Sequence, residues 1–176
     1  MTPKISPAEL SAIADLLRES SGIDLDQQKG YLVETRLSSL LRERCISGWA
    51  ALAQRARRDQ SLREAIVDAL TTNETSFFRD PKTFDLLAHK LIPEHYERLG
   101  AHAPLRIWSA AASTGQELYS VGMLLREMLG PLTTRKISIL GTDISPTALS
   151  AASAGLYSQL EVSRGLSAQR LSRYFS

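Results

Sequence analysis

Residues 105–143 constrain the fold of this chain more than any other part of the sequence. A short, mostly apolar run at 105–110 is bounded by turn signals and followed by a loop of small residues at 112–115. Apolar residues then recur at helical spacing over 117–129, and a second apolar run at 137–143 ends in an aspartate. This order predicts a βαβ unit, in which a helix joins two buried, parallel strands.

The predicted unit indicates where a ligand would bind, because ligands of open α/β sheets lie at the carboxyl ends of the strands. The loop Ser113-Thr114-Gly115 leads into a helix N-terminus, whose free N–H groups favour an anionic or carboxylate-bearing ligand. It has neither the glycine pattern of dinucleotide-binding loops nor the lysine of a P-loop, which argues against NAD and ATP. Taken alone, the loop is equally consistent with a tight turn built for packing.

Two acids stand near this loop. Asp143, at the end of the second strand, can accept hydrogen bonds from both hydroxyls of a ribose, or it can cap the helix that starts at Ser145-Pro146. Glu117 lies in the first turn of its helix, where it complements the helix dipole or receives a ligand ammonium group. Position alone leaves both alternatives open for each acid.

Residues 71–80, with the sequence TTNETSFFRD, combine hydroxyls, an amide, two aromatic rings and an arginine. This content is typical of a binding loop, whereas a plain linker needs only flexible, solvated residues. Arg79 beside two phenylalanines suits a ligand carboxylate held in a partly dry cleft. The alternative is an interdomain staple, with both rings in the core and Arg79 paired to Asp80 or Asp85.

The first part of the chain predicts four short helices and no strand. Residues with capping chemistry mark the helix boundaries: Ser6 with Glu9, Gly22, Gly48, and Ser61 with Glu64. Because the connections are short, we expect an all-helical bundle at residues 1–70, followed by a linker and an α/β domain at 71–176. Over 81–99 the sequence predicts two helical pieces split by Pro93.

Composition excludes several classes of protein. The chain has 176 residues, 43% of them hydrophobic, and a formal net charge of +2, which is ordinary for a globular protein. The single cysteine, Cys45, cannot form an internal disulfide, and the N-terminus has no apolar signal region, so we expect a cytoplasmic location. The apolar stretches are too short for membrane insertion. His89, His95 and His102 lack zinc-ligand spacing, so we expect no metal site and place them at surface or capping positions.

Arginines gather in the second half of the predicted bundle. Between positions 36 and 63 there are seven arginines against two acids, a local excess of +5. Such an excess suits an acidic partner, although a solvated helix face is the plainer interpretation. A third interpretation is a nucleic-acid or nucleotide-second-messenger binding module, which steeply salt-dependent retention on DNA would support.

Three separated motifs, in order, resemble those of one family. They are Asn73-Glu74-Thr75-Ser76-Phe77-Phe78-Arg79, then Ile107-Trp108-Ser109-Ala110 with Ser113-Thr114-Gly115-Gln116-Glu117 and Tyr119-Ser120, then Gly141-Thr142-Asp143-Ile144-Ser145. Together they closely resemble the chemotaxis receptor methyltransferases of the CheR type. The resemblance spans the whole chain and includes the tail motifs at 155–157 and 171–175. It implies an α/β fold class, with a small N-terminal all-α bundle followed by a Rossmann-like, S-adenosylmethionine-dependent domain.

The resemblance also implies the reaction and the residues that carry it. A methyl group passes from S-adenosylmethionine to glutamate side chains on the cytoplasmic helices of chemoreceptors, leaving S-adenosylhomocysteine. The cofactor contacts implied by the matching motifs are Asn73, Thr75, Arg79, Glu117 and Asp143, with Arg79 the residue on which transfer depends most. Lys29, Arg36 and Arg42 fall where the family is thought to meet its receptor substrate. A regulatory protein or second-messenger adaptor is a further expected partner, and nucleic acid is not.

The chain departs from the family pattern in two motifs and in length. Ala111-Ala112 stands where members commonly have Gly-Cys, and Gln116-Glu117-Leu118 where they have Glu-Glu-Pro. Small residues and the acid are retained, so we expect the pocket shape to survive. The family continues well past position 176, and only two strong strand candidates are present here. We therefore expect an incomplete catalytic domain, inactive by itself, whose open sheet edge is covered by its own tail or by another chain.

Overall fold

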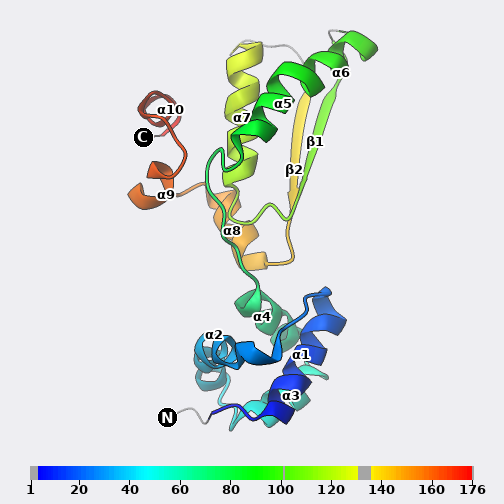
Figure 1. The fold of residues 1–176 in the computed structure, drawn as a ribbon, viewed down its shortest axis with the longest axis vertical. Helices are drawn as coiled ribbons and strands as arrows, with labels where there is room; N and C mark the ends of the chain where they lie inside the picture. The colour runs from blue at the N-terminus through cyan, green and yellow to red at the C-terminus, as the bar shows by residue number, and fades with distance from the viewer. Residues whose placement is uncertain (1–3, 101, 131–135, 176) are drawn as a thin grey trace. The chain divides into compact units, whose positions relative to one another are not determined.

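The structure, a computed structural model, describes residues 4–100, 102–130 and 136–175, which fall into two units (Figure 1). Unit 1 ends at Thr72 and unit 2 begins at Asn73. Among the described residues, no helix is both long and apolar enough to span a membrane.

Over its described residues, 4–72, unit 1 is built from helices, with no strand. Its elements are α1 (Pro7–Ser21), the 3₁₀ turn η1 (Gln27–Lys29), α2 (Gly30–Glu43), α3 (Trp49–Ala56) and α4 (Gln60–Leu70). Each α-helix turns one apolar face inward, and the side chains at the centre are fully buried, among them Leu17, Val33, Leu37, Trp49, Leu52 and Ile66. The predicted all-helical bundle is confirmed.

The start and the end of α1 are as the sequence predicts. The Ser6 hydroxyl accepts the Glu9 N–H, while the Glu9 carboxylate accepts the Ser6 N–H, so the capping box is complete. Hydrogen bonds from the Ser6 hydroxyl and backbone to the Glu9 carboxylate lower the pKa of Glu9. Gly22, with φ of 73°, closes the helix in the left-handed region that glycine adopts readily.

Two boundaries in unit 1 differ from the prediction. The capping box expected at Ser61 and Glu64 is wrong, because Asp59 caps α4 by accepting the Leu62 N–H at 3.1 Å. A carboxylate is as good an N-cap as a hydroxyl, and its charge also complements the helix dipole. The second helix ends at Glu43, well before Gly48, and the chain turns at Cys45, whose φ is +50°.

Unit 2 contains the predicted βαβ unit. Its elements are α5 (Pro81–Leu86), the π turn η2 (Leu87–Leu91), α6 (Ile92–Leu99), β1 (Leu105–Ala110), α7 (Gln116–Leu129), β2 (Ile137–Thr142), α8 (Pro146–Ala154), α9 (Gln159–Ser163) and α10 (Ala168–Tyr174). The two strands pair in parallel, with Leu105 opposite Ile137 and Ala110 opposite Thr142. Both therefore end at the same edge of the sheet.

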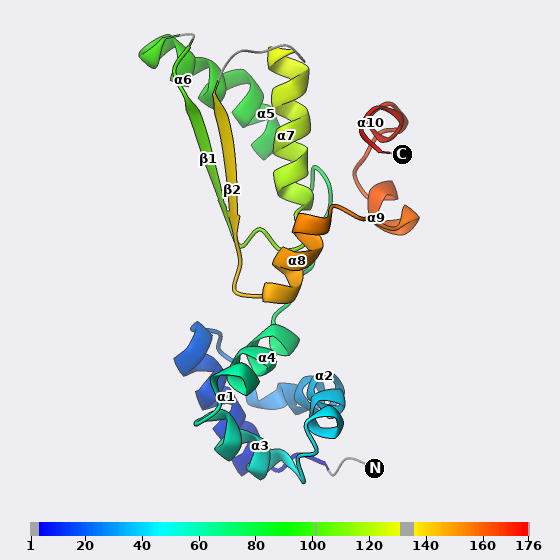
Figure 2. The same cartoon turned by 180° about the vertical axis from the view of Figure 1, so that it is seen from behind.

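Helices cover one face of this sheet. Figures 1 and 2 show α5, α6 and α7 on one side of the two strands, and their apolar side chains meet those of the sheet in one cluster. The expectation that β1 is a buried strand is wrong for its other face, where Trp108 is 68% exposed and its neighbour Leu140 58% exposed. The reason is the alternation of side chains along a strand, which sends every second residue to the face that no described helix covers.

The helical segment before β1 is continuous, so the predicted split at Pro93 is wrong. The chain stays helical from Pro81 to Leu99, and the irregularity is the π turn just before the proline. There the Ile92 N–H donates to the Leu87 carbonyl, five residues back instead of four. A proline crowds the carbonyl four residues before it, and a widened turn accommodates it without breaking the helix.

Candidate functional site

The site is built where β1 and β2 end side by side. The Ala112 N–H donates to the Thr142 carbonyl at 2.9 Å, and the Ser113 N–H donates to the Asp143 carboxylate at 2.7 Å. The loop after β1 is thus fastened to the loop after β2. This is the edge at which the sequence places a ligand site.

The backbone of the loop after β1 is unusual. Ala111 and Ser113 have φ of 61° and 51°, values that non-glycine residues rarely adopt, and Gly115 has φ of 93°. A Cβ on Gly115 would come within 2.8 Å of the Ala152 Cβ, so only glycine fits there. Left-handed, non-glycine residues cluster at sites where the surrounding structure holds them for a function.

Asp143 is half-buried and fixed through both of its oxygens. Oδ2 accepts the Ser113 N–H at 2.7 Å and Oδ1 accepts the Ser145 N–H at 2.9 Å. The alternative that Asp143 caps α8 is wrong, because Ser145 occupies that position and its hydroxyl accepts the Ala148 N–H. Each carboxylate oxygen has two lone-pair sites, so these bonds leave capacity for two ribose hydroxyls.

Glu117 lies exposed in the first turn of α7. Its Oε1 accepts a hydrogen bond from the hydroxyl of Ser109 at 2.7 Å, and Ser109 is a buried residue of β1. The bond holds the carboxylate near the end of the strand and leaves its second oxygen able to accept from an ammonium group. Both alternatives for this residue, dipole complement and ammonium receptor, are compatible with the geometry.

The 73–79 loop contacts this edge of the sheet through Asn73. The Asn73 carbonyl accepts the Ser113 hydroxyl at 2.9 Å, and the Asn73 side-chain amide donates to the Ser145 hydroxyl at 3.2 Å. Thr75 is half-buried farther along the same loop. Asn73 and Asp143, 70 positions apart in the chain, therefore belong to one hydrogen-bonded group.

Arg79 lies at the other end of the loop and is exposed. Its guanidinium donates to the Glu74 carbonyl at 2.9 Å, which closes the loop on itself and differs from the pairing with Asp80 or Asp85 considered above. A guanidinium has five N–H donors, more than this bond uses, so it remains suited to a carboxylate ligand. Phe77 is fully buried and Phe78 half-buried within unit 2, as the staple alternative expected for both rings.

Three serines complete the site, and no site role was assigned to Ser109, Ser120 or Ser145 from the sequence. Ser109 positions Glu117, Ser145 joins Asn73 to the start of α8, and Ser120 accepts the Phe78 N–H at 3.0 Å. All three are buried, and a serine among the apolar positions of a predicted strand or helix, as at Ser109 and Ser120, is the signal that could have pointed to two of them.

The candidate receptor-binding residues of unit 1 differ in their surroundings. Lys29 and Arg42 are exposed on η1 and α2. Arg36 is half-buried, and its guanidinium donates to the carbonyls of Leu70 and Thr71 at 3.0 and 2.9 Å. Those carbonyls belong to the C-terminal end of α4, where a cation stabilises the helix dipole. Arg36 therefore has a structural task within the bundle that Lys29 and Arg42 do not share.

The described part of the chain contains no group of three or more His, Cys, Asp or Glu side chains able to hold a metal ion. His89 is exposed, with Nδ1 3.0 Å from the Asp85 carbonyl, and His102 is exposed as well. His95 differs from the expected surface position, since it is half-buried and its ring packs edge-on against Tyr96.

Comparison with known protein families divides the chain at the same place as the structure does. Residues 8–71 match the family described as the CheR methyltransferase all-alpha domain, and residues 73–176 match the CheR methyltransferase SAM-binding domain. A chemotaxis protein methyltransferase of Pseudomonas aeruginosa is 42% identical over 173 residues, covering 96% of this chain and 62% of that protein. A chemotaxis protein methyltransferase of Vibrio parahaemolyticus is 41% identical over 176 residues, covering 97% of this chain and 62% of that protein. One from Salmonella typhimurium is 35% identical over 173 residues, covering 97% of this chain and 57% of that protein. The chain spans about 60% of the length of these curated relatives.

Proposed function

The chain belongs to the CheR methyltransferase family, and on this premise we propose that unit 2 binds S-adenosylmethionine for methylation of glutamate carboxylates on the cytoplasmic helices of chemoreceptors. The product nucleoside is S-adenosylhomocysteine, and the reaction takes place in the cytoplasm. The names of the relatives, all chemotaxis protein methyltransferases, support the reaction class.

The observation that carries this proposal is the joining of Asn73, Ser113 and Asp143 at the carboxyl ends of β1 and β2. A ligand at this edge meets the carboxylates of Asp143 and Glu117 and the 73–79 loop. Acids suit the ribose hydroxyls and the ammonium group of the cofactor, and Arg79 suits its carboxylate. The charges offered by the chain thus match those of the cofactor.

When bound, S-adenosylmethionine would supply the methyl group of its sulfonium to a glutamate carboxylate and leave as S-adenosylhomocysteine, with no proton to move. The glutamate is already ionised near neutral pH, so the chain needs no general base. We assign position and alignment to its residues: Arg79 to the amino-acid carboxylate, Glu117 to the ammonium group, Asp143 to the ribose. Asn73 and Thr75 line the reacting end. Such alignment is worth roughly 7 to 11 kcal/mol at best.

Unit 1 is proposed to recognise the receptor. Lys29 and Arg42 are exposed cations on neighbouring elements, and they suit the acidic helices that carry the substrate glutamates. Arg36 contributes through the fold of the bundle, because its guanidinium is engaged by the end of α4. The exposed arginines of α3 and its flanks, Arg55, Arg57 and Arg58, are available to an acidic regulatory protein or a second-messenger adaptor.

The test joins residues 1–176 to the segment of the Pseudomonas aeruginosa relative that lies outside the match. The chimera, labelled S-adenosylmethionine and a receptor cytoplasmic fragment are expected to give methyl esters on glutamate, released as methanol by base. The 176-residue chain alone is expected to bind S-adenosylhomocysteine without multiple turnover, because the two strands found among the described residues supply one side of a cofactor cleft. A folded chimera that binds the nucleoside but labels no glutamate would contradict the proposal.

A further inference from the structure

The segment that carries α9 and α10 packs directly on the 73–79 loop. Phe77 is fully buried, with its ring edge-on to Tyr157 at 5.1 Å and to Phe175 at 5.5 Å. The approach of the two backbones is close, because a Cβ on Gly165 would collide with the Phe77 carbonyl oxygen. The connection between α9 and α10 therefore rests on the backbone of the loop.

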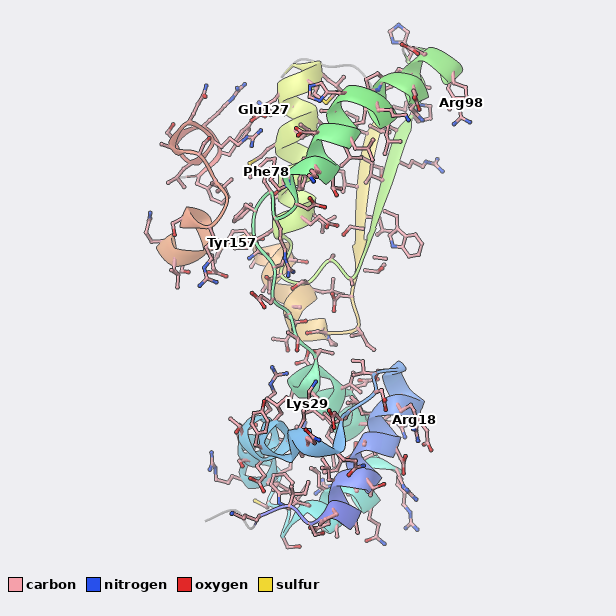
Figure 3. All side chains as sticks on the ribbon, in the orientation of Figure 1. Arg18, Lys29, Phe78, Arg98, Glu127 and Tyr157 are labelled. Carbon is pink, nitrogen blue, oxygen red and sulfur yellow. The ribbon has the colours of Figure 1, made fainter. Side chains whose placement is uncertain are left out.

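Arg170, on α10, makes two different contacts at this place. Its guanidinium donates two hydrogen bonds to the Glu127 carboxylate of α7, at 3.0 and 2.8 Å. The same guanidinium lies 3.8 Å above the centre of the Phe78 ring. Figure 3 marks Glu127 on α7 and Phe78 where the loop runs into α5. One side chain thus connects α10, α7 and the loop.

The ion pair between Arg170 and Glu127 lies near the surface, with side chains 29% and 27% exposed. Hydrogen bonds from Arg170 lower the pKa of Glu127, and the same bonds raise the pKa of Arg170. Both groups are therefore charged at neutral pH when the protein is folded, so the group above the Phe78 ring is a cation.

Phe78 needs such support because its backbone is strained. Its φ is +48°, a costly conformation for a bulky residue. The Phe78 N–H donates to the Ser120 hydroxyl at 3.0 Å, and its ring packs on Phe84 with 4.8 Å between centroids. Arg170 holds the ring as well, which fixes the turn that leads directly into Arg79.

We propose that Arg170 is a positioning residue for the cofactor loop: by stacking on Phe78 it holds the left-handed turn that presents Arg79, while its ion pair with Glu127 fastens α10 to α7. This rests on the proposed function only in that the loop contacts the cofactor. The two contacts of Arg170 can be tested separately. The ion pair forms whichever of positions 127 and 170 carries the positive charge, whereas the Phe78 ring needs the cation at position 170.

The experiment uses Arg170→Ala and the charge swap Arg170→Glu with Glu127→Arg, with Arg164→Ala as the control at an exposed position of the same segment. Three quantities are measured on the 176-residue chain: the melting temperature, the hydrogen-exchange rates of the Phe78 and Arg79 amides, and the dissociation constant for S-adenosylhomocysteine. Arg170→Ala is expected to lower the melting temperature, speed exchange at both amides and weaken binding, each of the last two by about tenfold. Arg164→Ala is expected to change none of them.

The charge swap distinguishes positioning from plain stability. It is expected to restore most of the melting temperature, because the ion pair is rebuilt, but neither the slow exchange nor the affinity, because a carboxylate then faces the ring. Full recovery of exchange and affinity in the swap would overturn the positioning role. If the unaltered chain bound no S-adenosylhomocysteine, the proposed function would fail, and the exchange rates would still decide the role of Arg170.

Discussion

Arg79 and Asp143 contribute to the site in physically different ways. Asp143 is half-buried and accepts hydrogen bonds from two backbone N–H groups, so it holds two loops together in addition to its proposed contact with the cofactor. Arg79 is exposed, and its one bond described here goes to a carbonyl of its own loop. Loss of Asp143 therefore affects the fold, whereas loss of Arg79 is expected to affect the ligand alone.

Arg79→Ala should leave the unfolding free energy nearly unchanged and weaken S-adenosylhomocysteine binding. A charge-assisted contact to a ligand carboxylate is worth about 1.5 to 3 kcal/mol, which corresponds to roughly a 10- to 150-fold loss of affinity. Calorimetric titration measures the effect, and Arg98→Ala, at an exposed position of α6, is the matched control. Equal affinities for the two variants would show that Arg79 has no part in binding.

The sequence could predict candidate site residues whose place follows from one strand or one helix. It could not predict residues whose contacts depend on how two elements pack together. Asp143 and Glu117 follow from their places after a strand and at a helix start. Ser109, by contrast, meets Glu117 only because the helix folds back over the strand. The capping of α4 by Arg36 depends likewise on two helices packed together, which local sequence does not reveal.

Several helix and strand boundaries followed local rules, although α2 ends at Glu43 and not at Gly48 as predicted. Ser6 caps α1 as predicted, and β1 has the predicted bounds. Where two signals competed, the prediction failed: Asp59 replaced Ser61 as a cap, and a π turn absorbed Pro93. The exposure of the second sheet face depends on which elements lie over it, and that is a tertiary property.

Gly165→Ala should destabilise unit 2 far more than Gly100→Ala. Both glycines have φ near +90°, a backbone conformation in which alanine is strained, so both substitutions carry a backbone cost. Only at Gly165 would the new methyl group collide with a backbone oxygen, that of Phe77, while nothing lies within 4 Å at Gly100. Urea denaturation compares the two, and equal losses would mean that the close approach to Phe77 does not matter in solution.

Glu127→Gln should make the free energy of unfolding depend less steeply on pH below 4.5. Because the hydrogen bonds from Arg170 lower the folded pKa of Glu127 below its ordinary value of 4.5, the carboxylate stabilises the fold above 4.5. That contribution is lost as the pH falls from 4.5 through the lowered pKa. Urea denaturation over this interval should give a steeper decline for the unaltered chain than for the variant. Parallel curves would show that the pair contributes nothing, since Glu9 and Glu161, whose pKa values are also lowered, are common to both proteins.

The two units divide the proposed work, so surface changes in one should leave the other unaffected. Reversing Lys29 and Arg42 to Glu is expected to weaken receptor binding at least tenfold at low salt and to leave S-adenosylhomocysteine binding unchanged. Reversing Lys4 and Arg18 changes the net charge equally and serves as the control. If both pairs weaken receptor binding alike, general electrostatic attraction explains the effect and no local surface is needed.

The whole account depends on a nucleoside site at the carboxyl ends of β1 and β2. Titration of the isotope-labelled chain with S-adenosylhomocysteine, followed by the shifts of its amide resonances, locates that site directly. We expect saturable, one-to-one changes that are largest at Ser113, Glu117 and Asp143, with the amides of unit 1 unmoved. An absence of saturable changes, or changes confined to the arginines of unit 1, would contradict it.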